Sequence, residues 1–347
     1  MAEENPKKDL FNNADSDGRF NRKPSTFRSW VVPSSSLNSD SASNTNGTSP
    51  IQSFPAAKGR YVLYIHLVCP WAHRTLITHR LKGLQDVIRV IELDDMDREF
   101  GWCWNGKGKH GWTEDPIYGG TKYLRGLYDR AVQNSGERKF EGRVTVPVLW
   151  DLEEGTIVNN ESGEIIRMLY SAFDEFLPEG QREVSKGGKG LLPDHLKERI
   201  NSMNEWVYHE INNGVYKCGF AAAQEAYDEN IYKLFDALDR VEAWLGQQGK
   251  GPYLFGEDIT EADIRLFPTL IRFDVAYFTI FKCNLKMIRY EYPRIHQWLR
   301  NLYWDERGKT KGAFRETVAF DAYKYGYSQA TKQKVVPAGP RPNILPL

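Results

Sequence analysis

A short apolar run that leads directly into a cysteine and a proline restricts the fold of this chain most. Residues 60–67 read RYVLYIHL, which has the length and the aromatic and β-branched content of a buried strand. Cys69 and Pro70 follow, and apolar residues then recur at helical spacing. Because proline is favoured in the first turn of a helix, we expect a helix to begin at Pro70. A second apolar run at 87–93 then predicts a β-α-β unit.

Two further strands and a helix are predicted to complete this unit. Residues 144–150 and 156–158 are apolar, although Pro147 interrupts the first of these runs and suggests an edge or a bulge. A helix is expected from about residue 161 to residue 173. Residues 97–140, which are rich in Gly, Trp and Lys, are predicted to be irregular.

The second half of the chain is predicted to be entirely helical. Residues 194–212 read as a helix, and residues 228–245 carry an amphipathic apolar stripe. Thr260 and Asp263 have the spacing of a capping box, so a helix should begin there. Pro268 is expected to kink that helix or end it early.

The ends of the chain and one internal stretch have different compositions. Residues 1–33 are polar with spaced aromatic residues, which is typical of an extended arm pinned to a domain. Residues 34–58 are Ser- and Asn-rich, above all at 34–54, and are predicted to be flexible because they bury too little apolar surface. Residues 331–347 are proline-rich and are expected to be extended.

The composition argues against several classes of function. Lys+Arg and Asp+Glu both total 46, so the formal net charge is zero, which disfavours bulk electrostatic binding to nucleic acid or acidic membranes. No apolar run approaches the roughly 18 residues of a membrane span, and no secretory signal is visible. Four scattered cysteines without a CxxC pair indicate a reducing compartment, and we predict a cytoplasmic protein. The histidines show no metal-ligand spacing, so no metal is predicted.

Cys69 is the strongest candidate for chemistry. A thiol at a helix N-terminus meets unpaired backbone N–H groups and the positive end of the helix dipole, which favour the nucleophilic thiolate. His73 and Arg74 are expected to add positive potential. Ala72 stands three positions after Cys69, so this motif contains no second thiol, and an external thiol such as glutathione is needed. The other cysteines are expected to be small buried residues: Cys103, Cys218 and Cys283.

Two further segments have groups that suit a peptide-like ligand. The backbone N–H and C=O before Pro147 would pair with an extended peptide if the Val146–Pro147 bond were cis. Glu161 and Ser162, at the expected start of a helix, suit an ammonium and a carboxylate. Taken alone, the proline is also consistent with an ordinary edge strand that binds no ligand, and Glu-Ser at a helix start is more often a simple cap.

Six motifs in order are similar to one known family. The segments CPWAHR, RVTVPVLW, NNES, NNGVYKCGF, ITEADIRL and RFDVAYFTIFKC resemble the glutathionyl-hydroquinone reductases, the Xi class of glutathione transferases, and the similarity extends over about residues 19–330. The resemblance implies an α/β thioredoxin-like N-terminal domain at 59–176 and an all-α glutathione-transferase C-terminal domain at 190–330. It also implies a homodimer that reduces glutathionyl-hydroquinones to hydroquinones with glutathione as co-substrate.

The resemblance assigns roles to individual residues. It makes Cys69 the nucleophile and Tyr216 the proton donor or acceptor, and it implies that Tyr277 and Tyr327 help to lower the cysteine pKa. It places the glutathione contacts at these positions: Trp102, Arg143, Val144, Thr145, Val146, Glu161 and Ser162.

Three other functions remain open at this point. An omega-like thioltransferase or dehydroascorbate reductase would use the same cysteine chemistry. A conventional conjugating transferase would activate glutathione through Ser or Tyr, and a cysteine at the site argues against it. A non-catalytic binding module has no need to keep all the motifs that surround Cys69.

Overall fold

The computed structural model describes residues 15, 17–21, 24–36, 52–133, 136–248, 251–305 and 308–347. Most of the Ser- and Asn-rich stretch, residues 37–51, therefore lies outside the described part of the chain. None of the helices in that part has the length and apolar character needed to cross a membrane.

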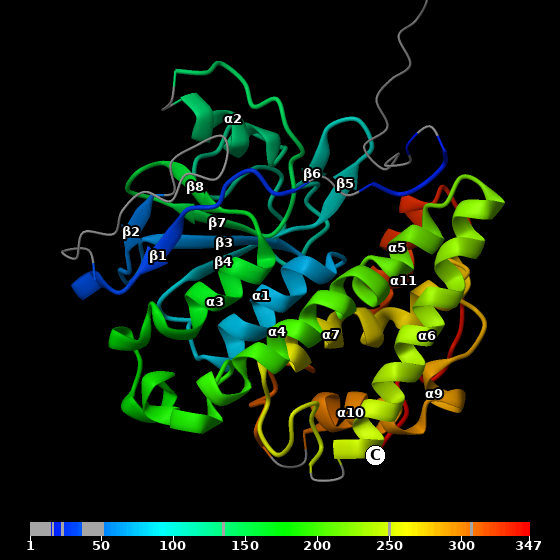
Figure 1. The fold of residues 1–347 in the computed structure, drawn as a ribbon. Coiled ribbons are helices and arrows are strands. Elements are labelled where there is room, and N and C mark those ends of the chain that lie inside the picture. The colour runs from blue at the N-terminus through cyan, green and yellow to red at the C-terminus, as the bar shows by residue number, and fades with distance from the viewer. Residues whose placement is uncertain are drawn as a thin grey trace, which may run out of the picture.

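A mixed four-stranded sheet forms the centre of the first domain. Its order is β4-β3-β7-β8, with β3 parallel to β4 and antiparallel to β7, and β7 antiparallel to β8. Helices α1 and α3 pack together on one face of the sheet and α2 covers the other (Figure 1). The elements are β3 (Tyr61–His66), α1 (Pro70–Leu81), β4 (Arg89–Leu93), α2 (Arg125–Gln133), β7 (Val148–Asp151), β8 (Thr156–Asn159) and α3 (Ser162–Ser171).

The structure confirms the β-α-β unit and corrects two expectations beside it. The strand predicted at 144–150 begins only at Val148, and the Val146–Pro147 bond before it is cis. Residues 97–140 are not irregular throughout, because they contain α2 and part of a small hairpin, β5 (Asp95–Asp97) with β6 (Gly101–Cys103). Helix α2 buries residues at positions 127, 128, 131 and 132, a helical pattern that the surrounding Gly and Lys residues obscure.

The arm and the end of the Ser/Asn-rich stretch form a small sheet of their own. Strand β1 (Trp30–Val32) pairs in parallel with β2 (Ser53–Pro55). The expectation of flexibility over all of 34–58 is therefore wrong at its C-terminal end, because Val31 and Phe54 are buried against the first domain. Hydrogen bonds between the two strands satisfy their backbone N–H and C=O groups and so order this segment. The local composition gives no sign of this pairing.

The second domain is helical, as predicted. Its helices are α4 (Lys197–Trp206), α5 (Gly214–Gly219), α6 (Gln224–Gln248), α7 (Glu261–Arg272), α8 (Phe278–Ile280), α9 (Ile288–Glu291), α10 (Pro293–Trp304) and α11 (Phe320–Ala330). The helix predicted at 194–212 ends in a π-helical turn at Val207–Asn212, and a second π-helical turn at Phe273–Tyr277 follows α7. Short 3₁₀ turns occur at Ser34–Ser36, Asp174–Phe176, Glu179–Gln181, Val184–Lys189 and Asp194–Leu196.

Helix α7 begins as predicted and ends later than expected. Thr260 is its N-cap, and the carboxylate of Asp263 accepts a hydrogen bond from the Thr260 backbone N–H at 2.8 Å. Pro268 lies inside the helix, which continues to Arg272. The expected early boundary at Pro268 is thus wrong. Proline has no backbone N–H, so α7 lacks one helical hydrogen bond at this residue, but packing against α1 and α4 stabilises the helix beyond it.

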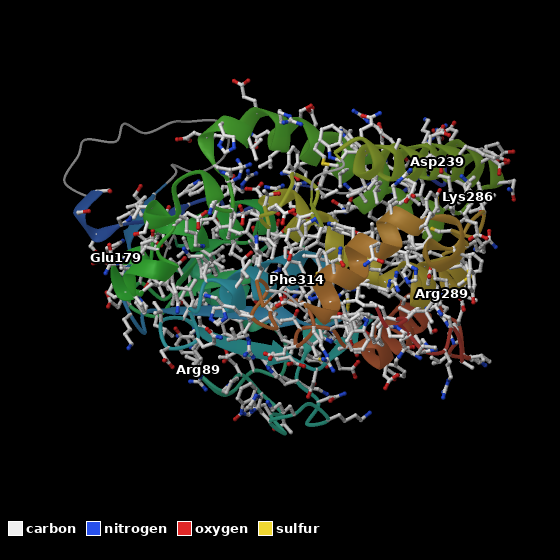
Figure 2. The ribbon with its side chains drawn as sticks, turned by 90° about the horizontal axis from the view of Figure 1, so that it is seen from below. Arg89, Glu179, Asp239, Lys286, Arg289 and Phe314 are labelled. Atoms are coloured by element: carbon white, nitrogen blue, oxygen red, sulfur yellow. The ribbon has the colours of Figure 1, made fainter. Side chains whose placement is uncertain are left out.

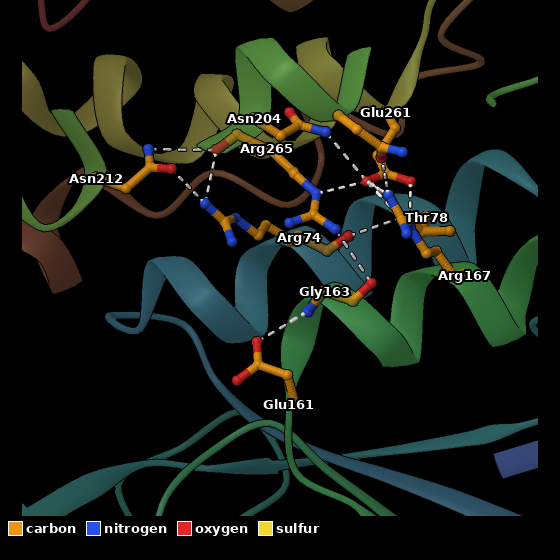
Figure 3. A network of polar contacts seen from close by, with 10 residues as sticks. Arg74, Thr78, Glu161, Gly163, Arg167, Asn204, Asn212, Glu261 and Arg265 are labelled. Carbon is orange, nitrogen blue, oxygen red and sulfur yellow. Dashed lines mark hydrogen bonds and ion pairs between the residues drawn. The ribbon is translucent and has the colours of Figure 1, made fainter. Parts of the chain in front are cut away.

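A buried carboxylate joins the two domains. Glu261 of α7 accepts hydrogen bonds from Arg167 of α3, and its Oε1 lies 2.7 Å from Nε of Arg265 (Figure 3). Asn204 of α4 donates to the same carboxylate at 3.1 Å. The side chain of Arg265 also donates to the carbonyl of Gly163, in the first turn of α3, at 3.3 Å. This network fixes α3 against the helical domain.

We expect Glu261→Gln to destabilise the folded protein. The amide keeps the shape of the side chain but removes the charge that two arginines share, so the free energy of unfolding should fall by about 1.5–3 kcal/mol. Urea unfolding followed by circular dichroism measures the change. Asp239→Asn is the control, because Asp239 and Lys286 form an exposed pair at the edge of the molecule (Figure 2), which contributes only about 0–1 kcal/mol. Equal losses in the two variants would contradict the role of Glu261.

Candidate active site

The structure places Cys69 at the N-cap of α1, directly after the turn that follows β3. Its backbone is extended (φ −74°, ψ 117°), and Pro70 is the first residue of the helix, as predicted. The side chain is buried, and its Sγ lies 3.4 Å from the carbonyl oxygen of Val146. The thiol therefore lies where the N-terminus of α1 meets the residues that precede the cis proline. The other three cysteines are buried, as expected.

His73 does not supply the positive charge that the sequence suggested. Burial lowers its pKa well below the usual histidine value, and the charge of Arg272 lowers it further. A guanidinium can only donate, so Nδ1 of His73 accepts from Arg272 at 2.9 Å, and Nε2 is left to donate to Thr317 at 2.8 Å. The ring is therefore neutral at pH 7. Arg74 lies over the ring of Trp71 and donates to Asn212 at 2.6 Å.

Three tyrosines from the helical domain meet beside Cys69. The hydroxyl of Tyr327 lies 3.0 Å from that of Tyr216 and 2.8 Å from that of Tyr277. It also donates to the carbonyl of Val68, the residue before Cys69, at 3.3 Å. Burial raises the pKa of Tyr216 well above the usual tyrosine value, and the charges of Tyr327 and Cys69 raise it further. We call Tyr216, Tyr277 and Tyr327 the tyrosine triad.

Aromatic side chains surround the half-buried Tyr216. Its ring centroid lies 5.5 Å from that of Phe281 and 6.5 Å from that of Trp71. Phe20 of the N-terminal arm packs against it at 5.9 Å and against Phe220 at 6.0 Å. The sequence indicated that the aromatic residues of the arm pack on a domain, but it did not indicate that one of them lies at this site.

A buried tyrosine, Tyr128 of α2, holds two of the predicted glutathione-binding segments together. Its hydroxyl donates to the carbonyl of Thr145 at 2.8 Å and accepts from the Thr145 backbone N–H at 3.2 Å. Asn160, next to Glu161, donates to the same hydroxyl at 3.1 Å. Glu161 is the N-cap of α3, as expected, and accepts from Ser25 of the arm at 2.9 Å. Sequence reasoning missed Tyr128 and Ser25, because neither lies in a recognisable motif.

We expect Tyr128→Phe to weaken glutathione binding. Loss of the hydroxyl removes the partner of the Thr145 backbone groups and one of the two partners of the Asn160 side-chain amide nitrogen, which costs about 1–3 kcal/mol of stability. The segment is then less well ordered, and the Kd for glutathione should rise about tenfold, which corresponds to ~1.4 kcal/mol. Isothermal titration calorimetry measures the Kd. The control is Tyr170→Phe, because the buried hydroxyl of Tyr170 has no hydrogen-bond partner among the residues that the structure describes. An unchanged Kd in Tyr128→Phe would refute the expectation.

The remaining predicted residues occupy neighbouring positions. Trp102 lies on β6, and its ring packs at a tilt of 40° against that of His66, with the ring centroids 4.7 Å apart, so it contacts the end of β3 that leads to Cys69. Arg143 and Val144 are half-buried in the loop before Val146. Ser162 is the buried first residue of α3. The described residues contain no group of three or more His, Cys, Asp or Glu side chains that is arranged to hold a metal ion.

Comparison with known proteins decides the family. Two domain models match, the glutathione S-transferase N-terminal domain over residues 68–172 and its C-terminal domain over residues 224–301. The chain belongs to the glutathione S-transferase family. Within that family it belongs to the Xi class, on the evidence of its relatives and structural neighbours.

Relatives match over almost the whole chain. Glutathione S-transferase omega-like 2 of Schizosaccharomyces pombe is 41% identical, over 94% of this chain and 95% of its own length. The glutathionyl-hydroquinone reductase YqjG of Escherichia coli is 42% identical, over 91% of this chain and 86% of its own length. The glutathione-bound structure of YqjG has a TM-score of 0.76, with 39% identity and coverage of 92% and 95% of the two chains.

A solved Xi-class structure has the same architecture. The glutathione S-transferase Xi of Phanerochaete chrysosporium has a TM-score of 0.80 and 42% identity, and the match covers 96% of each chain. The expected fold, a thioredoxin-like domain followed by an all-helical domain, is thereby confirmed.

Proposed function

We propose that this protein is a glutathionyl-hydroquinone reductase in which Cys69 is the nucleophile and Tyr216 the proton donor. The hydrogen-bonded tyrosine triad beside Cys69 carries this proposal. A thiolate that leaves a disulfide needs no proton, whereas an aryl carbon is a poor leaving group without one. A proton-donor cluster beside the thiol therefore favours carbon–sulfur cleavage. Relatives named glutathionyl-hydroquinone reductase support the same activity.

Glutathione is the proposed ligand of the thioredoxin-like domain. We assign the backbone of residues 143–146 to pairing with its peptide groups, and the 3.4 Å distance between Sγ of Cys69 and the carbonyl oxygen of Val146 supports this assignment. Glu161 and Ser162, at the N-terminus of α3, are assigned to its charged ends. Trp102 is assigned to a contact with the bound glutathione. A glutathione-bound relative supports the ligand.

The first step of the proposed reaction forms a mixed disulfide. The Cys69 thiolate attacks the glutathione sulfur of the glutathionyl-hydroquinone, so that a sulfur–sulfur bond forms as the aryl carbon–sulfur bond breaks. The electron pair of the broken bond stays on the aryl carbon, which takes a proton from the hydroxyl of Tyr216. The two sulfurs are oxidised, the carbon is reduced by two electrons, and hydroquinone leaves.

The second step restores the enzyme. A second glutathione gives up its thiol proton, which returns to the Tyr216 oxygen, and its thiolate attacks the glutathione sulfur of the mixed disulfide. Glutathione disulfide leaves, and Cys69 becomes a thiolate again. The aromatic residues around Tyr216 are assigned to stacking on the hydroquinone ring.

Turnover of two substrates tests this function against thiol exchange alone. The protein is incubated with glutathione and either glutathionyl-menadiol or the mixed disulfide of glutathione and 2-mercaptoethanol. We expect rapid release of menadiol. Release of 2-mercaptoethanol without menadiol would reject the proposal in favour of an omega-like thioltransferase, and failure on both substrates would favour a binding role.

The predicted homodimer and the cytoplasmic location rest on the sequence resemblance and on the residue composition. Light scattering coupled to size-exclusion chromatography tests the first, with a mass of twice 40.0 kDa expected. A monomer at micromolar concentration would contradict it.

A further inference from the structure

A fully buried arginine lies behind the candidate active site. Arg272, at the end of α7, is 0% exposed. Its Nε donates to the carbonyl of Val68 at 3.3 Å, and one terminal nitrogen donates to the carbonyl of Leu67 at 2.8 Å. These are the two residues directly before Cys69, so Arg272 holds the turn that presents the thiol.

Among the described residues, the groups that contact the guanidinium of Arg272 are neutral. The other terminal nitrogen donates to the carbonyl of Pro268 at 2.8 Å and to the neutral ring of His73. The guanidinium carbon lies 3.7 Å from the ring centroid of Tyr323. The acidic residues near it in the sequence pair with other arginines, Glu261 with Arg265 and Asp274 with Arg289, and no ion pair of the described residues includes Arg272. Arginine keeps its proton in proteins, so this is a buried unit charge without a counter-charge, which is costly to maintain.

One carbonyl connects Arg272 to the tyrosine triad. The Val68 oxygen accepts hydrogen bonds from both Arg272 and the hydroxyl of Tyr327. Tyr327 in turn contacts Tyr216 and Tyr277. Burial is the main cause that raises the pKa of each triad hydroxyl, and the charge of Arg272 opposes it in all three. A negative charge that forms on the triad is therefore stabilised by Arg272.

The proposed reaction supplies the missing counter-charge, and the present inference rests on that reaction. The site carries one negative charge on the Cys69 thiolate before the first step. After that step Cys69 is part of a neutral disulfide, and the negative charge is on the Tyr216 oxygen. We propose that Arg272 is a positioning residue whose buried positive charge balances this single negative charge as it moves from the sulfur of Cys69 to the oxygen of Tyr216.

Two substitutions of Arg272 separate its charge from its hydrogen bonds. Arg272→Gln keeps an N–H donor for the carbonyls of Leu67 and Val68 but removes the charge. Arg272→Lys keeps the charge but loses the planar guanidinium, whose several N–H groups donate to both carbonyls. The first measurement is the rate at which iodoacetamide alkylates Cys69 at pH 7, read by mass spectrometry of the Cys69 peptide so that the other three cysteines do not contribute. The second is menadiol release from glutathionyl-menadiol. We expect both rates to fall about tenfold or more in Arg272→Gln and to stay within about threefold of the wild-type rates in Arg272→Lys.

The matched control is Arg289, a second buried arginine that holds backbone carbonyls. It donates to the carbonyls of Pro342 and Asn343 and is paired with Asp274, and it lies near the outer edge of the helical domain (Figure 2). Arg289→Gln should leave the alkylation rate of Cys69 in the folded protein unchanged.

The outcomes distinguish the inference from the proposed function. Unchanged alkylation in folded Arg272→Gln, or a lysine variant as slow as the glutamine variant, would overturn the role of the charge. If Arg272→Gln does not fold, a fall of more than about tenfold in the alkylation rate of Cys69 in Arg272→Lys overturns the role of the charge by itself. If the wild type releases no menadiol, the proposed function fails and the transfer of charge to Tyr216 fails with it. The alkylation rates then report on the charge at Cys69 alone.

Discussion

Cys69→Ser is expected to abolish turnover of glutathionyl-menadiol, with a loss of more than about 10³-fold in the rate of menadiol release. A serine hydroxyl is nearly the same size as the thiol but is not ionised at pH 7, and it cannot form the mixed disulfide. Incubation of the wild type with glutathionyl-menadiol alone should leave a glutathione-sized mass on Cys69. The variant should show no such adduct, although it still binds glutathione.

Cys103→Ser is the control for this substitution. Cys103 is also buried in the first domain, and burial raises the pKa of its thiol to about 11, so it is not a nucleophile at pH 7. Its replacement should leave menadiol release close to the wild-type rate. An adduct on a cysteine other than Cys69, or residual turnover in Cys69→Ser above about one hundredth of the wild-type rate, would contradict the assignment of the nucleophile.

Tyr216→Phe is expected to slow carbon–sulfur cleavage about 10²–10⁴-fold, which is the usual contribution of a positioned proton donor. The phenyl ring of the variant keeps its contacts with the surrounding aromatic side chains, so substrate binding should change little. Reduction of the mixed disulfide of glutathione and 2-mercaptoethanol should stay within about threefold of the wild-type rate, because a thiolate leaves without a proton. Single-turnover release of menadiol and of 2-mercaptoethanol measures the two rates.

Tyr227→Phe provides the comparison for the loss of a tyrosine hydroxyl. The hydroxyl of Tyr227 donates to the carbonyl of Lys282 at 2.6 Å in the same domain, outside the site. This variant should treat both substrates as the wild type does. Equal slowing of both substrates in Tyr216→Phe would assign that residue a structural role rather than proton transfer.

Local signals predicted the elements that carry the nucleophile and the glutathione-binding groups. The apolar run before Cys69 and the proline after it placed the thiol at the start of a helix, because both signals act within a few residues. The capping box at Thr260 is equally local. Helix α2 escaped prediction because a single buried face within a Gly-rich region gives a weak periodic signal.

The charges of the site were less predictable than its residues. His73 directly follows the nucleophile motif and suggested positive potential, but its ring is neutral because burial disfavours the charged form. The charge comes instead from Arg272, which is far along the chain and within hydrogen-bond distance of the turn before Cys69. Burial and partner identity are properties of the folded state, so composition alone did not reveal them.

The sequence by itself determined which chemistry is available: one thiol at a helix N-terminus, a proline after Val146, and a helix that opens with Glu161 and Ser162. These features depend on short-range sterics and on the dipole of one helix. Only the tertiary structure decided what surrounds the thiol. Tyr216 and Tyr327 are 111 positions apart, and Tyr277 and Tyr327 are 50 positions apart. Their hydroxyls meet beside Cys69 because the two π-helical turns and the packing of the helical domain against α1 bring them together, and no local pattern records such long-range contacts.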